Sequence, residues 1–132
     1  MRFLLFLIFM SASLWSGAFL EVEQKKAMKE KKFILLNVGS ERCPFCIKMK
    51  KNVYDHPMYS KMIAKNYVYV EVMHDEIMLP SRLHVKYLPT HYILSPKDLS
   101  VLDEFNGYVE PVHFMELLDE VYRQEAKFFS KL

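Results

Sequence analysis

The sequence has few of the features that mark several large classes of protein. Only three of its 132 residues are glycine, and none lies in a Gly-rich loop of the kind that holds a nucleotide phosphate. Its 18 basic and 16 acidic residues are scattered, so the net charge of +2 creates no strong field for nucleic acid or anionic lipid. These deficits disfavour nucleotide chemistry and predict that no nucleic acid is a partner.

Cysteine is also scarce, with Cys43 and Cys46 as the only two. A disulfide between them would close a very short loop, which stabilises a fold only weakly. A zinc site would need two more closely spaced ligands, and the five histidines, at positions 56, 74, 84, 91 and 113, form no such pair. We therefore interpret the two cysteines as a redox pair and expect no metal, with metal handling and a purely structural bridge as the alternatives.

What the chain does contain is enough apolar sequence for one compact domain, since 52% of the residues are hydrophobic and 26% are charged. Arg2 and the apolar run over 3–10 have the order of a secretory signal, with small residues before a cleavage point after Ala18. We predict a signal peptide over 1–18 and a domain over 19–132. The protein would be periplasmic or otherwise exported, and an uncleaved N-terminal anchor is the alternative.

The apolar patterns predict an α/β fold, with a small mixed central sheet and helices on both faces. The run over 33–38 is almost continuously apolar, as in a strand buried on both faces, and 67–72 is rich in β-branched and aromatic residues. Strands are predicted over 33–38, 67–72, 90–94 and 101–105. Helices are predicted over 21–32, 44–54, 58–65 and 111–122, with a short helix or turn over 80–87.

The two cysteines are placed for thiol chemistry. Pro44 suits the first turn of a helix, which puts Cys43 at the helix N-terminus, where the backbone N–H groups stabilise a thiolate. Cys46 lies almost one turn further on, close enough to attack a mixed disulfide formed by Cys43. We expect Cys43 to be accessible and Cys46 to be shielded.

The order of motifs along 21–123 resembles the thioredoxin superfamily, and most closely its small exported members. The residues that carry this resemblance are Cys43-Pro44-Phe45-Cys46, Lys48-Met49, Leu88-Pro89-Thr90 and Gly107-Tyr108. The resemblance implies a thioredoxin-like fold and a thiol-disulfide oxidoreductase, without a cofactor, that acts on proteins with thiols or disulfides. It also implies a membrane or soluble redox partner and a monomer.

In that family the proline that matches Pro89 is cis and lies beside the cysteines, where the flanking backbone binds the substrate chain as an added strand. The resemblance implies the same role for Leu88, Pro89 and Thr90, and an ordinary trans proline is the alternative. His91 follows directly. It either touches the site or, as the simpler interpretation, is a strand histidine satisfied by its neighbours.

Two positions depart from the family pattern. Thioredoxins usually carry a buried acid six residues before the first cysteine, where it helps to move the proton of the second, but Asn37 stands there. An amide cannot accept that proton, so water or another group such as Glu41 must do so, or the step is slower. Arg42 replaces a common tryptophan, and it either stabilises the Cys43 thiolate or is simply a solvated charge.

Two other functions remain open on the sequence. One is a copper or haem-assembly helper that uses the two thiols as ligands or as a reductant, and the other is a binding module without redox activity. The dipeptide Pro44-Phe45 resembles those of glutaredoxins and of strongly oxidising periplasmic proteins, which favours a reduction potential above that of thioredoxin.

Overall fold

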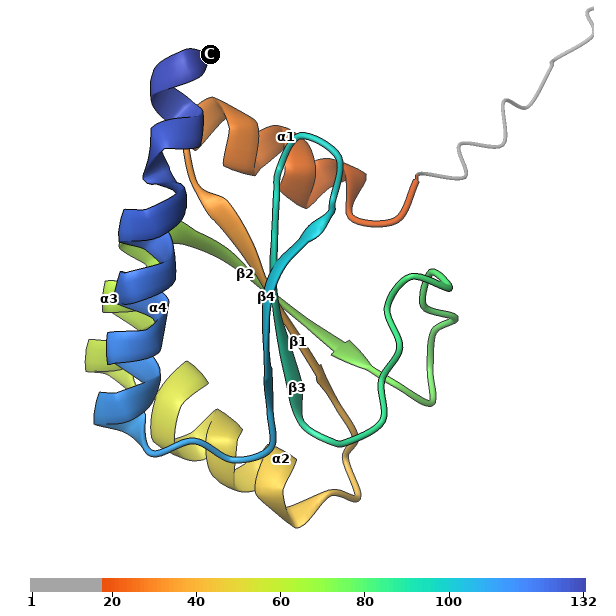
Figure 1. Ribbon diagram of the computed structural model, residues 1–132. Coiled ribbons are helices and arrows are strands. Elements are labelled where there is room, and N and C mark those ends of the chain that lie inside the picture. Colours follow the sequence, from red (N-terminus) through yellow and green to blue (C-terminus); the bar gives the residue numbers. More distant parts are fainter. Residues whose placement is uncertain (1–17) are drawn as a thin grey trace, which may run out of the picture.

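The computed structural model describes residues 18–132 (Figure 1). The predicted signal peptide, apart from Ala18, lies outside the described residues. None of the helices within 18–132 has the length and apolar character needed to cross a bilayer. The elements are α1 (Glu21–Glu30), β1 (Phe33–Gly39), α2 (Pro44–Met49), η1 (Lys50–Tyr54), α3 (Pro57–Asn66), β2 (Tyr67–Met73), β3 (Thr90–Leu94), β4 (Val101–Asn106), α4 (Pro111–Glu125) and η2 (Ala126–Lys131).

The four strands form one mixed sheet in the order β2-β1-β3-β4. β1 runs parallel to β2 and antiparallel to β3, and β4 is antiparallel to β3. Asn37 in the middle of the sheet is paired with Glu71 on one side and with His91 on the other. The parallel pair is joined by a helical crossover, as parallel strands require.

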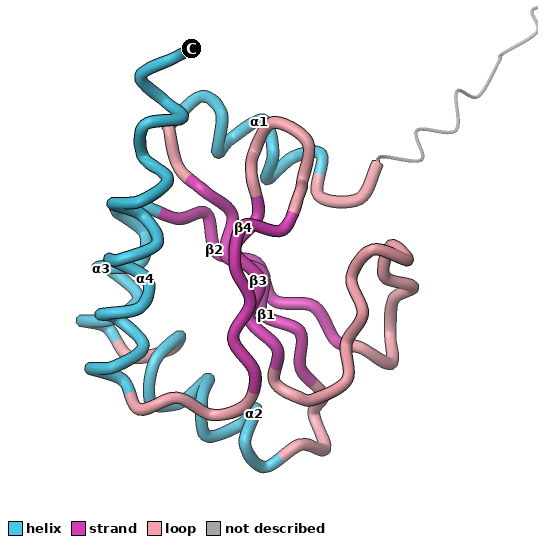
Figure 2. Tube along the Cα trace, viewed as in Figure 1, coloured by secondary structure: helices cyan, strands magenta, loops and turns pink. Residues whose placement is uncertain are grey.

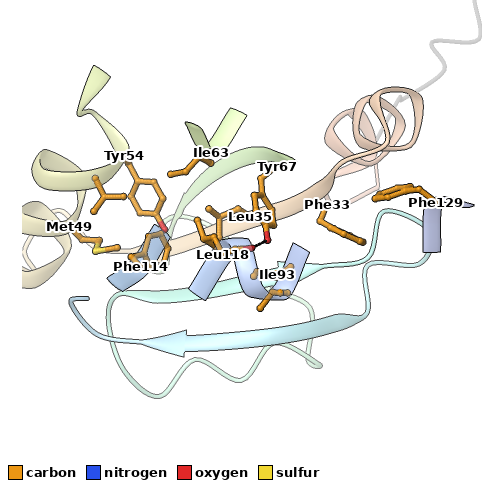
Figure 3. Close-up of a cluster of buried hydrophobic side chains, with 12 residues drawn as sticks. Phe33, Leu35, Met49, Tyr54, Ile63, Tyr67, Ile93, Phe114, Leu118 and Phe129 are labelled. Carbon is orange, nitrogen blue, oxygen red and sulfur yellow. Dashed lines mark hydrogen bonds between the residues drawn. The ribbon is translucent and has the colours of Figure 1, made fainter. Parts of the chain in front are cut away.

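The sheet separates two apolar clusters, which explains why β1 is apolar almost throughout. Phe33 and Leu35 point to one face and Ile34 and Leu36 to the other, because side chains alternate along a strand. The first cluster, under α2, η1, α3 and α4, is shown in Figure 3 and includes Met49, Tyr54, Ile63, Tyr67, Phe114, Leu118 and Phe129. The aromatic side chains at 67, 69, 114 and 122 all belong to this packing rather than to an open surface.

The opposite face is covered by α1 and by the long connection between β2 and β3. Ala27 of α1 and Leu83 of the connection are buried there against Tyr92 and Leu94. Figure 2 shows the connection as a loop on the side of the sheet away from α3 and α4. Helices therefore lie on both faces, as the sequence predicts.

The short helix or turn predicted over 80–87 is a turn, because Leu83 is the only buried residue of this segment and one buried residue does not make the apolar face of a helix. One element differs from the sequence prediction. The predicted helix over 44–54 is α-helical only to Met49 and continues as a π-helical turn, in which the Asp55 N–H donates to the Lys50 carbonyl at 2.8 Å. This wider turn allows Val53 and Tyr54 to be buried together.

Candidate functional site

Figure 1 shows α2 at the end of the sheet where β1 ends and β3 begins. Cys43 directly precedes Pro44, the first residue of α2. It has extended backbone geometry and caps α2, and Pro44 occupies the first helical turn. The Cys46 N–H donates to the Cys43 Sγ at 3.2 Å. The predicted position of Cys43 at a helix N-terminus is therefore confirmed, and a backbone donor is aimed at its sulfur.

The two cysteines differ in their access to solvent. Cys43 is half-buried, whereas only 7% of Cys46 is exposed, and both carry free thiols. Burial, together with the adjacent Cys43 thiol, raises the pKa of Cys46 to about 12. Cys46 also packs against Gly39, at the end of β1. The geometry thus matches the expectation of an accessible first thiol and a shielded second one.

The Leu88–Pro89 peptide bond is cis, as the resemblance implies, and it lies beside the cysteines. The Cys43 thiol donates to the Leu88 carbonyl at 3.6 Å. Thr90 is fully buried, and its hydroxyl donates to the Tyr87 carbonyl at 2.6 Å. The structure therefore brings Leu88, Pro89 and Thr90 together with Cys43, although they are far apart in the sequence.

His91 is buried, and both of its ring nitrogens have partners other than the cysteine sulfurs. Its Nδ1 accepts a hydrogen bond from the Tyr54 hydroxyl at 2.7 Å, and its Nε2 donates to the Gly107 carbonyl at 3.1 Å. Burial lowers the pKa of His91 to about 4, so the ring is neutral near pH 7. The interpretation of His91 as a satisfied strand histidine is confirmed.

Gly107 connects His91 to the loop that contains Leu88 and Pro89, which is called the proline loop below. Its N–H donates to the Pro89 carbonyl at 2.7 Å, and its φ of 81° is in the region that favours glycine. The neighbouring Tyr108 ring lies under the Lys48 ammonium, 4.1 Å from its centroid, and the Tyr108 hydroxyl accepts from Asn52 at 3.0 Å. The late Gly-Tyr pair thus holds β4 against both the proline loop and the helical region after the cysteines.

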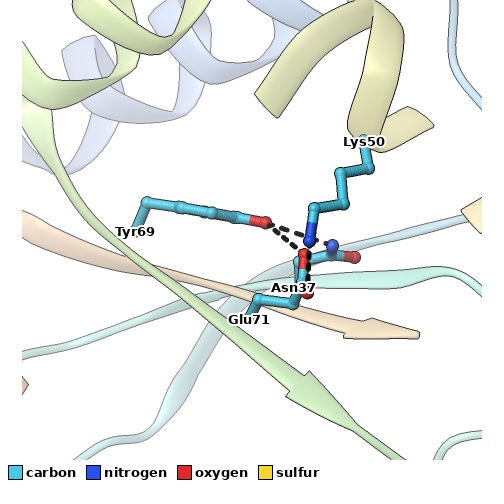
Figure 4. A network of polar contacts seen from close by, with 4 residues as sticks. All are labelled: Asn37, Lys50, Tyr69 and Glu71. Carbon is cyan, nitrogen blue, oxygen red and sulfur yellow. Dashed lines mark hydrogen bonds and ion pairs between the residues drawn. The ribbon is translucent and has the colours of Figure 1, made fainter. Parts of the chain in front are cut away.

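Asn37 is buried, with 3% of its surface exposed, and it lines a cavity of about 230 Å³ that also reaches Cys46. Its Nδ2 donates to the Tyr69 hydroxyl at 3.4 Å, and that hydroxyl donates to Glu71 Oε2 at 3.2 Å (Figure 4). Lys50 Nζ lies 3.0 Å from Glu71 Oε1. The position six residues before Cys43 therefore faces the same space as the second cysteine.

Sequence reasoning missed Glu71 and Lys50. The only sequence signal for Glu71 was a single acid within the otherwise apolar and aromatic run over 67–72. Its proximity to Asn37 depends on the pairing of β1 with β2, which no local pattern specifies. Lys50 is the first residue of η1, and its side chain reaches Glu71 from there.

The residues that flank the cysteines are open to solvent. Phe45 exposes 60% of its surface and Pro44 is also exposed, which leaves an apolar surface beside Cys43. Arg42 is exposed, and its guanidinium forms no ion pair within residues 18–132, which favours the interpretation of a solvated charge. The described part of the chain holds no cluster of three or more His, Cys, Asp or Glu side chains that could bind a metal.

Comparisons with known proteins agree with this geometry. A family model described as a thioredoxin-like domain matches residues 20–122, whereas a search of curated proteins gives no match. A thioredoxin from Thermus thermophilus is similar with a TM-score of 0.63 and 23% identity, over 76% of this chain and 81% of that one. The predicted mixed sheet with helices on both faces is confirmed.

Two further solved structures show the same likeness. The reduced periplasmic thioredoxin SoxS from Paracoccus pantotrophus has a TM-score of 0.52 and 17% identity, over 70% of this chain and 98% of its own. The reduced C-terminal domain of DsbD from Neisseria meningitidis has a TM-score of 0.53 and 16% identity, over 76% of this chain and 92% of its own. At these identities the likeness is one of fold.

Proposed function

Because this chain belongs to the thioredoxin-like domain family, we propose that it is a thiol-disulfide oxidoreductase that exchanges disulfides with exported proteins through Cys43 and Cys46. The observation that carries the proposal is the asymmetry of the two thiols. Cys43 is half-buried and accepts a hydrogen bond from a helical N–H, while Cys46 lies buried one turn behind it. This is the arrangement that an attacking and a resolving thiol require.

The reaction proceeds in two exchanges. The Cys43 thiolate attacks a disulfide of the partner protein, forms a mixed disulfide and releases the first partner thiol. Cys46 then attacks Cys43 Sγ, which forms the Cys43–Cys46 disulfide and releases the second. In the opposite direction the same steps oxidise a partner dithiol.

The proline loop supplies the surface on which the partner chain lies. Leu88 directs its carbonyl toward Cys43, and Pro89 and Thr90 continue from it into β3. A partner segment that lies against Leu88, Pro89 and Thr90 as an added strand would place its sulfur at Cys43. The exposed Phe45 beside Cys43 offers an apolar contact for the partner.

An exported location is part of the proposal. It is supported by the signal-like sequence over 1–18 and by the periplasmic description of SoxS, a protein of similar fold. In such a compartment thiols and disulfides of secreted proteins are the available substrates. A membrane or soluble redox partner would restore the working state of the cysteines, and the protein would act as a monomer.

Replacement of the resolving thiol tests this function. Cys46→Ser retains Cys43 but cannot release a partner, so mixed disulfides with cellular proteins should accumulate and disappear on reduction. The double variant Cys43→Ser/Cys46→Ser is the matched control and should form none. A folded Cys46→Ser protein that forms no adducts in the cells that make it would favour metal binding or a redox-inactive module instead.

A further inference from the structure

The exchange proposed above leaves one step without an obvious proton acceptor. Cys46 must lose its proton before it attacks the mixed disulfide, and its burial opposes that loss. Asn37, which occupies the family's acid position, carries an amide and cannot take the proton. A carboxylate elsewhere in the same space could do so.

The cavity beside Cys46 contains such a group. Its walls include Cys46, Asn37, Ser40, Glu41, Lys50 and Glu71. A volume of about 230 Å³ with this polar lining has room for several water molecules, which need polar partners to remain there. Water in the cavity would connect the Cys46 sulfur with the Glu71 carboxylate.

Glu71 is held in place as a hydrogen-bond acceptor. Tyr69 donates to its Oε2 at 3.2 Å and the Lys50 ammonium lies 3.0 Å from its Oε1, and the Glu71 side chain is only 20% exposed. Figure 4 shows these side chains converging from β1, β2 and η1. An anchored carboxylate with fixed donors is suited to proton transfer because it needs little rearrangement.

The orientation of Asn37 provides a second, independent observation. Its Oδ1 is buried and has no hydrogen-bond partner among the described residues, although its Nδ2 is bound to Tyr69. A buried acceptor without a partner is costly unless a water or a thiol donates to it. Since Asn37 lines the cavity, its Oδ1 can fix a water between Cys46 and the Tyr69–Glu71 pair.

We propose that Glu71 replaces the missing acid and accepts the proton of Cys46 through water in this cavity. This inference rests on the proposed function. The Cys46 proton passes to a cavity water, which gives a proton to Glu71. The Cys46 thiolate then forms a bond to Cys43 Sγ, the bond between Cys43 Sγ and the partner sulfur breaks, and the partner leaves as a thiolate.

The electrons balance in this exchange, because the two cysteines are oxidised to a disulfide while the partner disulfide is reduced to two thiols. Glu71 returns its proton to solvent after the exchange, and the partner thiolate takes up one. The other titratable or charged groups around Glu71 are Lys50 and Tyr54 of η1, Asp55 after it, Tyr69 of β2, and Glu41 and Cys46 at the cavity.

Ellman's reagent separates this step from the first exchange. With the reduced full-length protein, the first coloured thiolate is released when Cys43 attacks, at a rate proportional to reagent concentration. The second is released when Cys46 resolves the mixed disulfide, at a rate independent of it. For Glu71→Gln we expect an unchanged first phase and a second phase about tenfold slower near neutral pH, with a steeper rise toward alkaline pH.

Glu41→Gln is the competing variant, because it removes the other carboxylate of the same cavity, and it should slow the second phase much less than Glu71→Gln does. Asn37→Asp in the Glu71→Gln background returns a carboxylate to the cavity and should restore most of the second phase. The proposal is overturned by a second phase that Glu71→Gln leaves unchanged, by equal slowing in Glu41→Gln, or by equal slowing of both phases.

Failure of the proton acceptor can be distinguished from failure of the proposed function. If the wild-type protein completes both phases but never reduces a protein disulfide such as that of insulin, the oxidoreductase function fails while the proton acceptor stands. If insulin is reduced and the second phase does not respond to Glu71→Gln, the function stands and the acceptor fails.

Discussion

At the scale of single residues, Asn37 combines a neutral side chain with the burial of a core position. It lies between Glu71 and His91 of the neighbouring strands, with 3% of its surface exposed. A carboxylate here would lose most of its hydration and would face the charge of Glu71. Both effects would place the pKa of an Asp at this position above its ordinary value near ~3.9.

Asn37→Asp should therefore destabilise the protein in a pH-dependent way. The folded state keeps a proton that the unfolded chain releases, so the free energy of unfolding falls as pH rises from near ~4 through the raised folded pKa. Above that pH range, each unit by which the folded pKa of the Asp exceeds its unfolded pKa lowers the free energy of unfolding by about 1.4 kcal/mol. Urea unfolding across pH would measure it, and the uncharged variant Asn37→Ser should differ from wild type by a constant amount. The prediction would be contradicted if the free energy of unfolding of Asn37→Asp, like that of Asn37→Ser, differed from wild type by the same amount at every pH.

At the scale of elements, the connection from β4 to α4 depends on the backbone of Gly107. Its φ is 81°, and a side chain there would meet no atom within 4 Å, so any cost of a side chain comes from the backbone itself. Its N–H and carbonyl hold Pro89 and His91, respectively. The conformation of this one residue thus fixes β4 relative to the proline loop.

Gly107→Ala should lower the free energy of unfolding by about 1 kcal/mol, because an L side chain disfavours positive φ. It should also slow the exchange with a protein disulfide, since a backbone that relaxes away from a φ of 81° moves the N–H of residue 107 away from the Pro89 carbonyl. Chemical denaturation and insulin reduction would measure the two effects. Gly39→Ala, at an ordinary strand position, is the control for the stability effect. Equal stability of the two variants would show that the Gly107 conformation is not strained by a side chain.

Elements were predictable where a local pattern determines them. The strand over 90–94 is observed as Thr90–Leu94, and the apolar run over 33–38 is buried on both faces as expected. The helix after Cys43 was predicted as continuous, because the apolar spacing does not reveal that the turn at Lys50–Tyr54 widens to bury two adjacent residues. The connection over 80–87 is held by the packing of one residue, Leu83, into an apolar cluster whose other members are distant in the sequence.

The same distinction applies to the site. The cysteine pair is local, and the position of Asn37 followed from counting along one strand to Cys43. Glu71 and the Tyr54–His91 contact depend on strand register and on packing between elements, which a single sequence does not specify. The cis Pro89 was expected only because of the resemblance to a family.

At the scale of the whole molecule, His91 joins three parts of the fold. It lies in β3, accepts from Tyr54 of η1 and donates to Gly107 after β4. With its pKa lowered to about 4, the folded protein excludes a proton that the unfolded chain binds near ~6.5. The stability it contributes is therefore present near neutral pH and declines as the pH falls from about 6.5 to about 4.

The size of this decline is about 3 kcal/mol, from the difference between the two pKa values. Thermal or urea unfolding of wild type and of His91→Gln across this pH range would test it. The variant should be less stable near neutral pH because two hydrogen bonds are disturbed, but the difference should shrink on acidification. A difference that stays the same between pH ~7 and ~4 would show that His91 does not titrate as its burial requires.

The sheet order has a consequence for the order of events during synthesis. β1 is the first strand to emerge but lies inside the sheet, between β2 and β3. Its two edges cannot both be paired until Leu94, the last residue of β3, has left the ribosome. Until then the strand over 33–39 has an unpaired edge that can pair with other chains. A chaperone, or rapid release of the rest of the chain, would be needed to avoid aggregation.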